Sequence, residues 1–463
     1  MVVEPPMRRY QTAIAPALTL ATCIAFAAGE AAAQSGGMTE PVSRVIAGDS
    51  AMNLPQLTLD EVVARALAVS PIAASGTAGV QIARADKRMA TGAYIPTVTA
   101  TSEALRTDVQ SASGASSGAS SVRNSASSRT YGLAAAVDLF TGGRRRANEK
   151  AASAYLRVAG STLVADRFAV RLIAEQGFYE VVRATDLVRV ARRGLAEANQ
   201  LLRYTTDMFK AGTAMRSDLL RAQLQSTTMQ EQLLAATDTL VAASYALGWL
   251  VGADEAVGVR VDSVSQAIRP LALDDSAIVR LAVEASPSVG VANAVAAATK
   301  ESVRAARTQY VPTITATAGR NWAATTPVAP GAPQPGWTVA VGTSYPVFNG
   351  FQREDAIARA EAAAYVARVT ASDTRRSARA SAAQLLAALA TTTASISLGM
   401  EGIRSAREDL RVQTARYRAG ISTMLDVLTS EAALLQVEYS LAAARNRYHT
   451  TRAALEALVG RRL

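Results

Sequence analysis

Side chains that carry out catalysis or bind metals are scarce in this chain of 463 residues, which contains one cysteine, Cys23, and one histidine, His449. A Cys/His zinc site needs several such ligands, and a cysteine nucleophile needs a partner base. A Ser/His/Asp triad would depend on His449 alone, for which packing on a helix surface or in a helix seam is the simpler interpretation. The residue types therefore predict a protein that is not an enzyme and has neither a metal nor a cofactor.

Two aspartates have a spacing that suggests a local role. Asp218 and Asp426 each lie six residues beyond a glycine, Gly212 and Gly420, that interrupts a long helical pattern. An acid near the start of a helix caps it or interacts favourably with its dipole. Helix capping is therefore one interpretation of both aspartates.

The composition excludes several classes of protein. The chain is 49% hydrophobic and 5% aromatic, with 29 glycines and 15 prolines, which excludes collagen, a disordered tail and a disulfide-rich scaffold. The net charge of +10 could indicate nucleic-acid binding. The arginines are scattered among acids along helical segments, however, which is typical of solvated helix faces. We therefore predict no nucleic-acid partner.

The amino terminus resembles an export signal. Arg8 and Arg9 precede an apolar run over residues 13–28, which ends in small residues at 31–33. This pattern predicts a secretory signal peptide at 1–33 and a linker at 34–56. A lipoprotein signal at Cys23 is the rival interpretation, and we reject it because Thr22 suits it poorly. No other stretch approaches 18 uninterrupted apolar residues, so we expect no membrane-spanning helix.

An internal duplication organises the rest of the chain. Residues 94–101 recur as 310–317, a shift of 216, and Ser70-Pro recurs at the same shift. Three later matches share a shift of 208, and they pair residues 139–142 with 347–350, 210–212 with 418–420, and 250–252 with 458–460. One change of eight residues between 102 and 138 explains both shifts. We therefore predict two repeats, 57–252 and 271–463, joined by a linker at 253–270.

Each repeat contains two segments of strand-like alternation. Alternating residues and turn signals predict strands at about 95–107 and 129–140, and at about 311–323 and 336–347. These lengths suit tilted membrane strands. Four aromatic residues near the strand ends would sit at the membrane interface, namely Tyr131, Trp322, Trp337 and Tyr345. The strand pattern alone fits a soluble sandwich equally well.

A very long helical hairpin follows each pair of strands, at 144–252 and 352–460. Apolar residues recur every seven positions along these segments, as in Val181, Val188 and Leu195, which predicts coiled-coil packing. Four membrane strands cannot close a barrel, and an open sheet would leave backbone groups unpaired in lipid. If the strands span a membrane, two or three chains must share one barrel.

The sequence resembles the TolC-type outer-membrane efflux family. The resemblance covers nearly all of the chain after the signal, and its marks are residues 57–71, the two Tyr-(Ile/Val)-Pro-Thr junctions, and residues 139–143, 347–350, 416–420 and 425–428. It implies a mainly α fold with a small transmembrane β part. It also implies a homotrimer with a twelve-strand β-barrel in outer-membrane lipid and a twelve-helix α-barrel in the periplasm. Its implied partners are a periplasmic adaptor protein and an inner-membrane pump of the RND or ABC type.

The resemblance also assigns roles at the two glycine turns. It implies that Asp426 lines a constriction as a cation-attracting ring, with Tyr417 and Asp218 holding the channel shut. Adaptor docking is implied for residues of both turns, namely Gly212, Thr213, Ser217, Gly420, Ile421 and Ser422. Thr429 stands where some relatives have a second acid, so a second ring is in doubt, and Ser422 replaces a common arginine. Seam packing remains an alternative role for Tyr417.

These features predict a passive export duct. The alternative is a non-conducting coiled-coil structural or adhesive surface protein, which would show no conductance and no dependence on an adaptor. The cargo, the pump and the open-state geometry cannot be read from the sequence.

Overall fold

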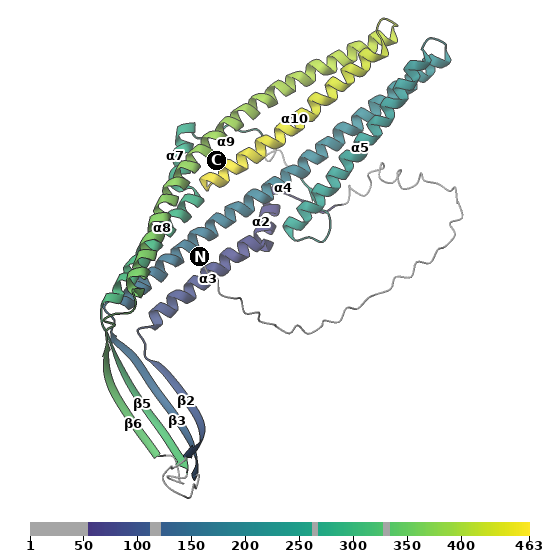
Figure 1. Cartoon of the computed structure of the whole chain (residues 1–463). Helices are drawn as coiled ribbons and strands as arrows, with labels where there is room; N and C mark the ends of the chain where they lie inside the picture. The colour runs from purple at the N-terminus through teal and green to yellow at the C-terminus, as the bar shows by residue number, and fades with distance from the viewer. Residues whose placement is uncertain (1–53, 112–121, 262–266, 327–333) are drawn as a thin grey trace, which may run out of the picture. The chain divides into compact units, whose positions relative to one another are not determined.

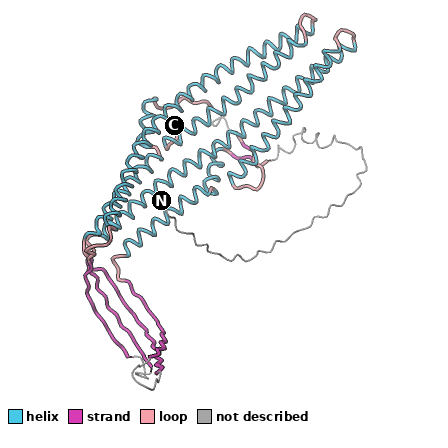
Figure 2. The backbone as a smooth tube through the Cα atoms, viewed as in Figure 1, coloured by secondary structure: helices cyan, strands magenta, loops and turns pink. Residues whose placement is uncertain are grey.

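The computed structural model describes residues 54–111, 122–261, 267–326 and 334–463. The expected signal peptide at 1–33, Cys23 and most of the linker at 34–56 lie outside these residues. The described chain is mostly helical with a small β part, which confirms the expected fold class at that level. Figure 1 follows the chain through its elements, and Figure 2 separates the helices from the strands.

The first repeat contains β1 (Gln56–Leu57), α2 (Leu59–Val69), α3 (Pro71–Gly92), β2 (Thr97–Ser111), β3 (Val122–Phe140), α4 (Arg144–Lys210) and α5 (Arg216–Val251). After β4 (Gly258–Val259), the second contains α7 (Asp275–Ala285), α8 (Pro287–Arg307), η2 (Thr308–Tyr310), β5 (Thr313–Thr326), β6 (Gln334–Ser344), α9 (Gln352–Arg418) and α10 (Met424–Val459). The order of the larger elements is the same in both repeats. The first strand pair extends beyond the expected bounds, to Ser111 and from Val122.

Local signals in the sequence set several of these boundaries. Thr58 caps α2 in a capping box, in which its backbone N–H donates to Glu61 Oε2 at 2.8 Å and its hydroxyl accepts from the Glu61 N–H at 3.4 Å. Pro71 begins α3, where its missing N–H costs nothing. Gly212 and Gly420 have φ angles of 77° and 74° where α4 and α9 end. These are left-handed conformations that glycine adopts without strain.

Four strands form one antiparallel sheet in the order β2-β3-β5-β6. In the two hairpins, Thr97 pairs with Ala136 and Thr313 pairs with Ser344. Thr313 corresponds to Thr97 at the shift of 216, and Ser344 corresponds to Ala136 at the shift of 208. The two hairpins therefore have the same register. The contact between the repeats is made by β3 and β5, which leaves β2 and β6 as the edges of the sheet.

The long helices pack along small and apolar side chains. Ala184, Ala191 and Ala198 of α4 are almost fully buried, so the neighbouring helices approach closely. The heptad positions of α10 are likewise buried, namely Val427, Leu434, Leu441, Tyr448 and Leu455. A helix of 67 residues, as in α4 and α9, is about 100 Å long. The sheet and the glycine turns therefore lie at opposite ends of these helices (Figure 1).

Three described helical stretches are long and apolar enough to cross a membrane, namely Arg216–Val251, Asp275–Tyr310 and Gln352–Arg418, and the bent pair α2–α3 would add a fourth if it formed one span. They meet the standard by length and mean hydropathy, although the sequence contains no uninterrupted apolar run of 18 residues outside the expected signal, and the expectation that no helix spans a membrane stays a prediction. Alanine explains the difference, because it raises mean hydropathy without forming an uninterrupted apolar run. Between 22% and 28% of each qualifying window is buried inside the chain, so most of this surface is open to other partners.

Candidate functional site

The turn between α4 and α5 is closed by its own backbone. The N–H of Gly212 donates to the carbonyl of Phe209 at 3.0 Å, and the N–H of Thr213 donates to that of Met208 at 2.9 Å. The Thr213 hydroxyl donates to the same Met208 carbonyl at 3.0 Å. Thr213 and Ser217 both lie near the tip of this hairpin, and both hydrogen bonds of Thr213 stabilise the turn.

The turn between α9 and α10 is closed in the same way but is capped differently. The N–H of Ile421 donates to the Arg416 carbonyl at 2.9 Å, and the Ser422 hydroxyl donates to the Gln413 carbonyl at 3.4 Å. Thr423 caps α10 in a capping box with Asp426. Ile421 is 69% exposed, which leaves an apolar side chain in solvent at the tip.

Aromatic contacts join the two hairpins close to their turns. Tyr417 packs in a buried cluster with Leu201 of α4 and Val427 of α10. Its ring meets that of Tyr204 edge-on, with a centroid separation of 6.4 Å. The Tyr204 hydroxyl donates to the Arg418 carbonyl at 3.5 Å, and the Arg418 guanidinium lies 5.2 Å from the centre of the Tyr204 ring. The seam packing that was the alternative role of Tyr417 is therefore present in one chain.

The two aspartates of the turns have different environments. Asp426 is exposed, and its Oδ2 accepts from the N–H and the hydroxyl of Thr423, both at 2.8 Å. These backbone and side-chain hydrogen bonds lower the pKa of Asp426, so the carboxylate stays charged. Asp218 is buried, and its Oδ1 lies 3.6 Å from Arg221 Nη1. Capping is thus observed for Asp426, and its side chain is exposed within one chain.

Thr429 and Ser422, the two residues that depart from the family pattern, each form a hydrogen bond within their own hairpin. The Thr429 hydroxyl donates to the Leu425 carbonyl of its own helix at 2.8 Å, and Ser422 is bonded across its own turn. Neither side chain adds a charge to the tip. The described second turn carries the charges of Asp426, Arg416 and Arg418, and the Arg416 charge contributes to lowering the pKa of Asp426.

Buried acids lie on the seam above the turns, and the sequence reasoning missed them. Glu438 of α10 is 6% exposed and forms two parallel bonds with Arg193 of α4, at 2.9 and 3.0 Å, while Arg407 of α9 donates to it at 3.3 Å. Glu431 is 3% exposed. Burial raises the pKa of Glu431 to about 7, with a further contribution from the nearby Glu197 carboxylate. The available signal was the spacing, since Glu431 falls on the apolar side of α10, four residues after Val427 and three before Leu434.

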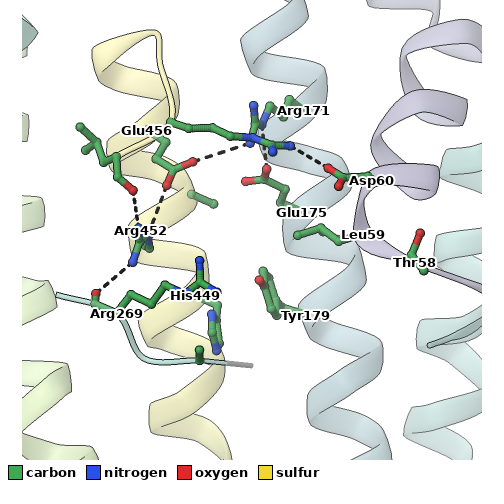
Figure 3. Close-up of a pocket in the computed structure, with 14 residues that line it drawn as sticks. Thr58, Leu59, Asp60, Arg171, Glu175, Tyr179, Arg269, His449, Arg452 and Glu456 are labelled. Carbon is green, nitrogen blue, oxygen red and sulfur yellow. Dashed lines mark hydrogen bonds and ion pairs between the residues drawn. The ribbon is translucent and has the colours of Figure 1, made fainter. Parts of the chain in front are cut away.

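A second feature that the sequence did not show is the charged pocket in Figure 3, where α2, α4 and α10 meet. Arg171 pairs with Glu175 at 2.7 Å and with Glu456 at 3.7 Å, and Arg452 lies 3.2 Å from Glu456. The His449 ring stacks on Tyr179 at a centroid distance of 4.4 Å. Burial, followed by the charge of Arg452, lowers the pKa of His449 to about 4. His449 is a neutral packing residue, as the simpler interpretation had it.

The register of the sheet decides where the four interface aromatics lie. Tyr131 pairs directly with Trp322, and Trp337 pairs with Arg320, which lies two residues from Trp322 on the same face of β5. Arg320 lies 5.2 Å from the centre of the Trp322 ring. Three of the four aromatics are therefore close to one level, and Tyr345 lies just beyond the other end of β6. Between these levels the same face carries Leu133, Val339 and other small or apolar side chains.

No group of three or more His, Cys, Asp or Glu residues that could hold a metal occurs in the described part of the chain.

The chain is similar to known proteins over most of its length. A family model described as outer membrane efflux protein matches residues 62–253 and 278–461, one segment in each repeat. No curated protein matches the sequence significantly.

Solved structures share the fold. CusC aligns with a TM-score of 0.74 and 19% identity over 88% of this chain and 93% of its own. The outer membrane protein VceC from Vibrio cholerae aligns with a TM-score of 0.70 and 20% identity over 87% and 96%. The CmeC outer membrane channel of Campylobacter jejuni aligns with a TM-score of 0.74 and 17% identity over 87% and 85%.

Proposed function

Because the chain belongs to the outer membrane efflux protein family, we propose that three copies form the passive outer-membrane duct of a tripartite export system. The family makes the chain an efflux protein of the outer membrane, with its helices forming a periplasmic tunnel. A periplasmic adaptor and an inner-membrane pump of the RND or ABC type would deliver the cargo and the energy. The chain itself would supply the walls and the gate.

The open sheet is the observation that supports the shared duct best. Four strands have one apolar face and two unpaired edges, and edge backbone groups are costly to leave unpaired in lipid. Three copies of four strands give twelve, which is within the range of closed membrane barrels. The apolar helix surface left uncovered within one chain fits the same assembly.

We assign the gate to the paired turns. The exposed, charged Asp426 would form a ring of three carboxylates around the axis, which attracts cations. Tyr417 and Asp218 would hold neighbouring hairpins together from their buried positions. Residues of the two tips would receive the adaptor, and Ile421 offers it an exposed apolar contact.

Single-channel recording of the purified protein in a planar bilayer tests this function. We expect a small, cation-selective conductance, and Asp426→Asn should lower the cation selectivity. Glu401→Gln, which neutralises an exposed acid of α9 well away from the turn, is the matched control and should change it little. If Asp426→Asn keeps the cation selectivity of the wild type, as the control does, Asp426 is not part of the gate. A protein without any conductance would favour the coiled-coil surface protein instead.

A further inference from the structure

A row of basic side chains follows the first pair of strands and is not repeated at the equivalent positions after the second pair. Arg146, Lys150 and Arg157 of α4 are exposed, and their spacing of four and then seven residues places them on one face of the helix. We call these three residues the basic stripe. At the shift of 208, their counterparts on α9 are Glu354, Ala358 and Tyr365. The junction between strand and helix therefore forms without a basic stripe.

The two arginines that begin α4 have partners within the chain, whereas the basic stripe has none. Arg144 Nη2 lies 3.5 Å from Asp138 Oδ2. Arg145 donates to the Leu139 carbonyl at 3.3 Å, and its guanidinium lies 4.8 Å from the centre of the Tyr94 ring. Among the described residues, no hydrogen bond or ion pair is formed by the side chains of the basic stripe. The charges of the stripe are therefore available to a ligand.

The basic stripe lines a cavity between α4 and α8. The cavity has a volume of about 370 Å³, and its other lining residues are Glu149, Ser153 and Glu301. The two helices pack on each other within one chain, so the cavity does not depend on a second copy. The Glu301 carboxylate is already paired with Arg304 at 2.5 Å. Three cations therefore share the cavity with one unpaired carboxylate of the described chain, that of Glu149, and this balance suits an anion.

The basic stripe lies on the side of the chain that carries the apolar face of the sheet. Asp138 pairs with Thr315 on the polar face of the sheet and accepts from its hydroxyl at 2.8 Å. Because Arg144 pairs with Asp138, this arginine is directed toward the polar face. Successive helical residues turn by about 100°, so Arg146 lies about 200° around α4 from Arg144. The stripe therefore points away from the polar face, toward the side on which Leu133 lies.

The basic stripe begins just beyond the end of the sheet, where the long helices start (Figure 1). Phe140 is the last residue of β3, and α4 begins at Arg144. At 1.5 Å per residue, Arg146 lies about 3 Å and Lys150 about 9 Å beyond the start of the helix. The headgroup layer on each side of a bilayer is about 5 to 7 Å deep. In an outer-membrane protein with periplasmic helices, this level is that of the headgroups of the periplasmic leaflet.

We propose that the basic stripe binds the phosphate of an anionic phospholipid in the periplasmic leaflet of the outer membrane. Arg146 and Lys150 contact the phosphate, and Ser153 and Arg157 form the end of the cavity farther from the membrane. Long basic side chains at a membrane surface reach the headgroups while their aliphatic stems stay on apolar surface. The site goes beyond the duct function, because it involves neither the gate nor the adaptor. It requires the outer-membrane location of the chain and does not require the trimer.

Native mass spectrometry of the detergent-purified protein with added phosphatidylglycerol tests the site. Each basic residue at a membrane surface contributes about fivefold in affinity, so Arg146→Gln with Lys150→Gln should weaken binding about 25-fold. Arg192→Gln with Arg379→Gln is the matched control, since it removes the same charge from exposed positions of α4 and α9 far from the sheet. The control should bind as the wild type does. Zwitterionic phosphatidylethanolamine should bind weakly to the wild type and to both double variants.

A charge-conserving variant distinguishes a lost site from a misfolded protein. Arg146→Lys with Lys150→Arg keeps both charges and should keep the preference for phosphatidylglycerol. Equal binding of the two lipids by the wild type, or unchanged binding after Arg146→Gln with Lys150→Gln, would overturn the site. Displacement of the lipid by inorganic phosphate would also overturn it, because the cavity would then be a site for small anions. Conductance and the native mass without added lipid test the proposed duct separately, so either proposal can fail while the other holds.

Discussion

The junction between strand and long helix occurs twice in this chain, at residues 139–143 and 347–351, and the two copies have different surroundings. The first is covered by the start of β5 from the other repeat, and its Thr141 is buried. The second projects from the edge of the sheet, where Phe348 and Phe351 contact each other edge-on at 5.4 Å and are largely exposed. Duplicated sequence therefore does not mean duplicated environment, since the chain covers the first junction and leaves the second exposed.

The second hairpin differs from the first in charge as well. Glu431 and Glu438 of α10 correspond, at the shift of 208, to Gln223 and Gln230 of α5. The inter-repeat seam between α4 and α10 therefore contains an ion pair in which the Glu438 carboxylate is buried and the Arg193 side chain is half exposed. The equivalent residues of α5 are neutral. A substitution at one position can therefore be compared with a substitution at its counterpart or at a matched control position. The comparison separates the loss of local packing from effects on the assembly.

The largest effect is expected at the covered junction. Gly142→Ala should destabilise the protein by about 3 kcal/mol or more, because the new methyl group meets Val311 and the φ angle is positive. Gly143→Ala is the matched control, since it has a positive φ of 83° and open space around it, and should cost about 1 kcal/mol. Chemical unfolding of the purified protein measures both. Equal costs would show that the packing against Val311 is unimportant.

The second largest effect is expected at the buried Glu438 carboxylate of the seam. Glu438→Ala removes the buried partner of Arg193 and Arg407 and should cost about 2 kcal/mol. Glu408→Ala breaks the fully exposed pair with Arg411 on α9 and should cause no measurable change. Thermal or chemical unfolding compares the two. If Glu438→Ala were as stable as the wild type, the ion pair would not hold the repeats together.

The protonation of Glu431 makes the second repeat sensitive to pH. Its pKa is raised from 4.5 to about 7 in the fold, so its proton stabilises the folded state at low pH, and this contribution is lost as the pH rises through about 7. From pH 5 to pH 8 the free energy of unfolding should fall by about 2 kcal/mol on this account. Glu431→Gln, which makes the position resemble Gln223, should flatten the pH profile. An unchanged profile would mean that Glu431 is charged throughout.

The smallest effect is expected at Phe351, which has a φ of 64° and is the one non-glycine residue with positive φ in the described chain. It replaces Gly143 of the first repeat. Phe351→Gly should relieve about 1 kcal/mol of backbone strain and lose the contact with Phe348, so unfolding should shift little in either direction. A large loss of trimer with unchanged monomer stability would show that Phe351 acts in the assembly.

Much of the fold could be predicted because its signals are local. The glycine turns, the proline that begins α3 and the alternation in the strands depend on neighbouring residues. The contacts of Glu438 with Arg193 and of His449 with Tyr179 join residues more than 200 positions apart, and no local pattern encodes which helix packs on which. The extension of β2 to Ser111 was missed because the pairing with β3, rather than alternation, sustains it.

The roles of the site residues depend on groups that one chain does not contain. Asp426 takes part in capping α10, and the ring proposed for it would require two further copies. Tyr417 packs against Tyr204 of its own chain, so the fraction of its contacts that crosses to a neighbour can be measured only in the assembly.

Native mass spectrometry of the detergent-extracted protein tests the central claim most directly. The shared barrel predicts a particle of three chains that remains intact in mild detergent. A stable, folded single chain would contradict it, because the sheet edges β2 and β6 and the junction at 347–351 would then need no partner.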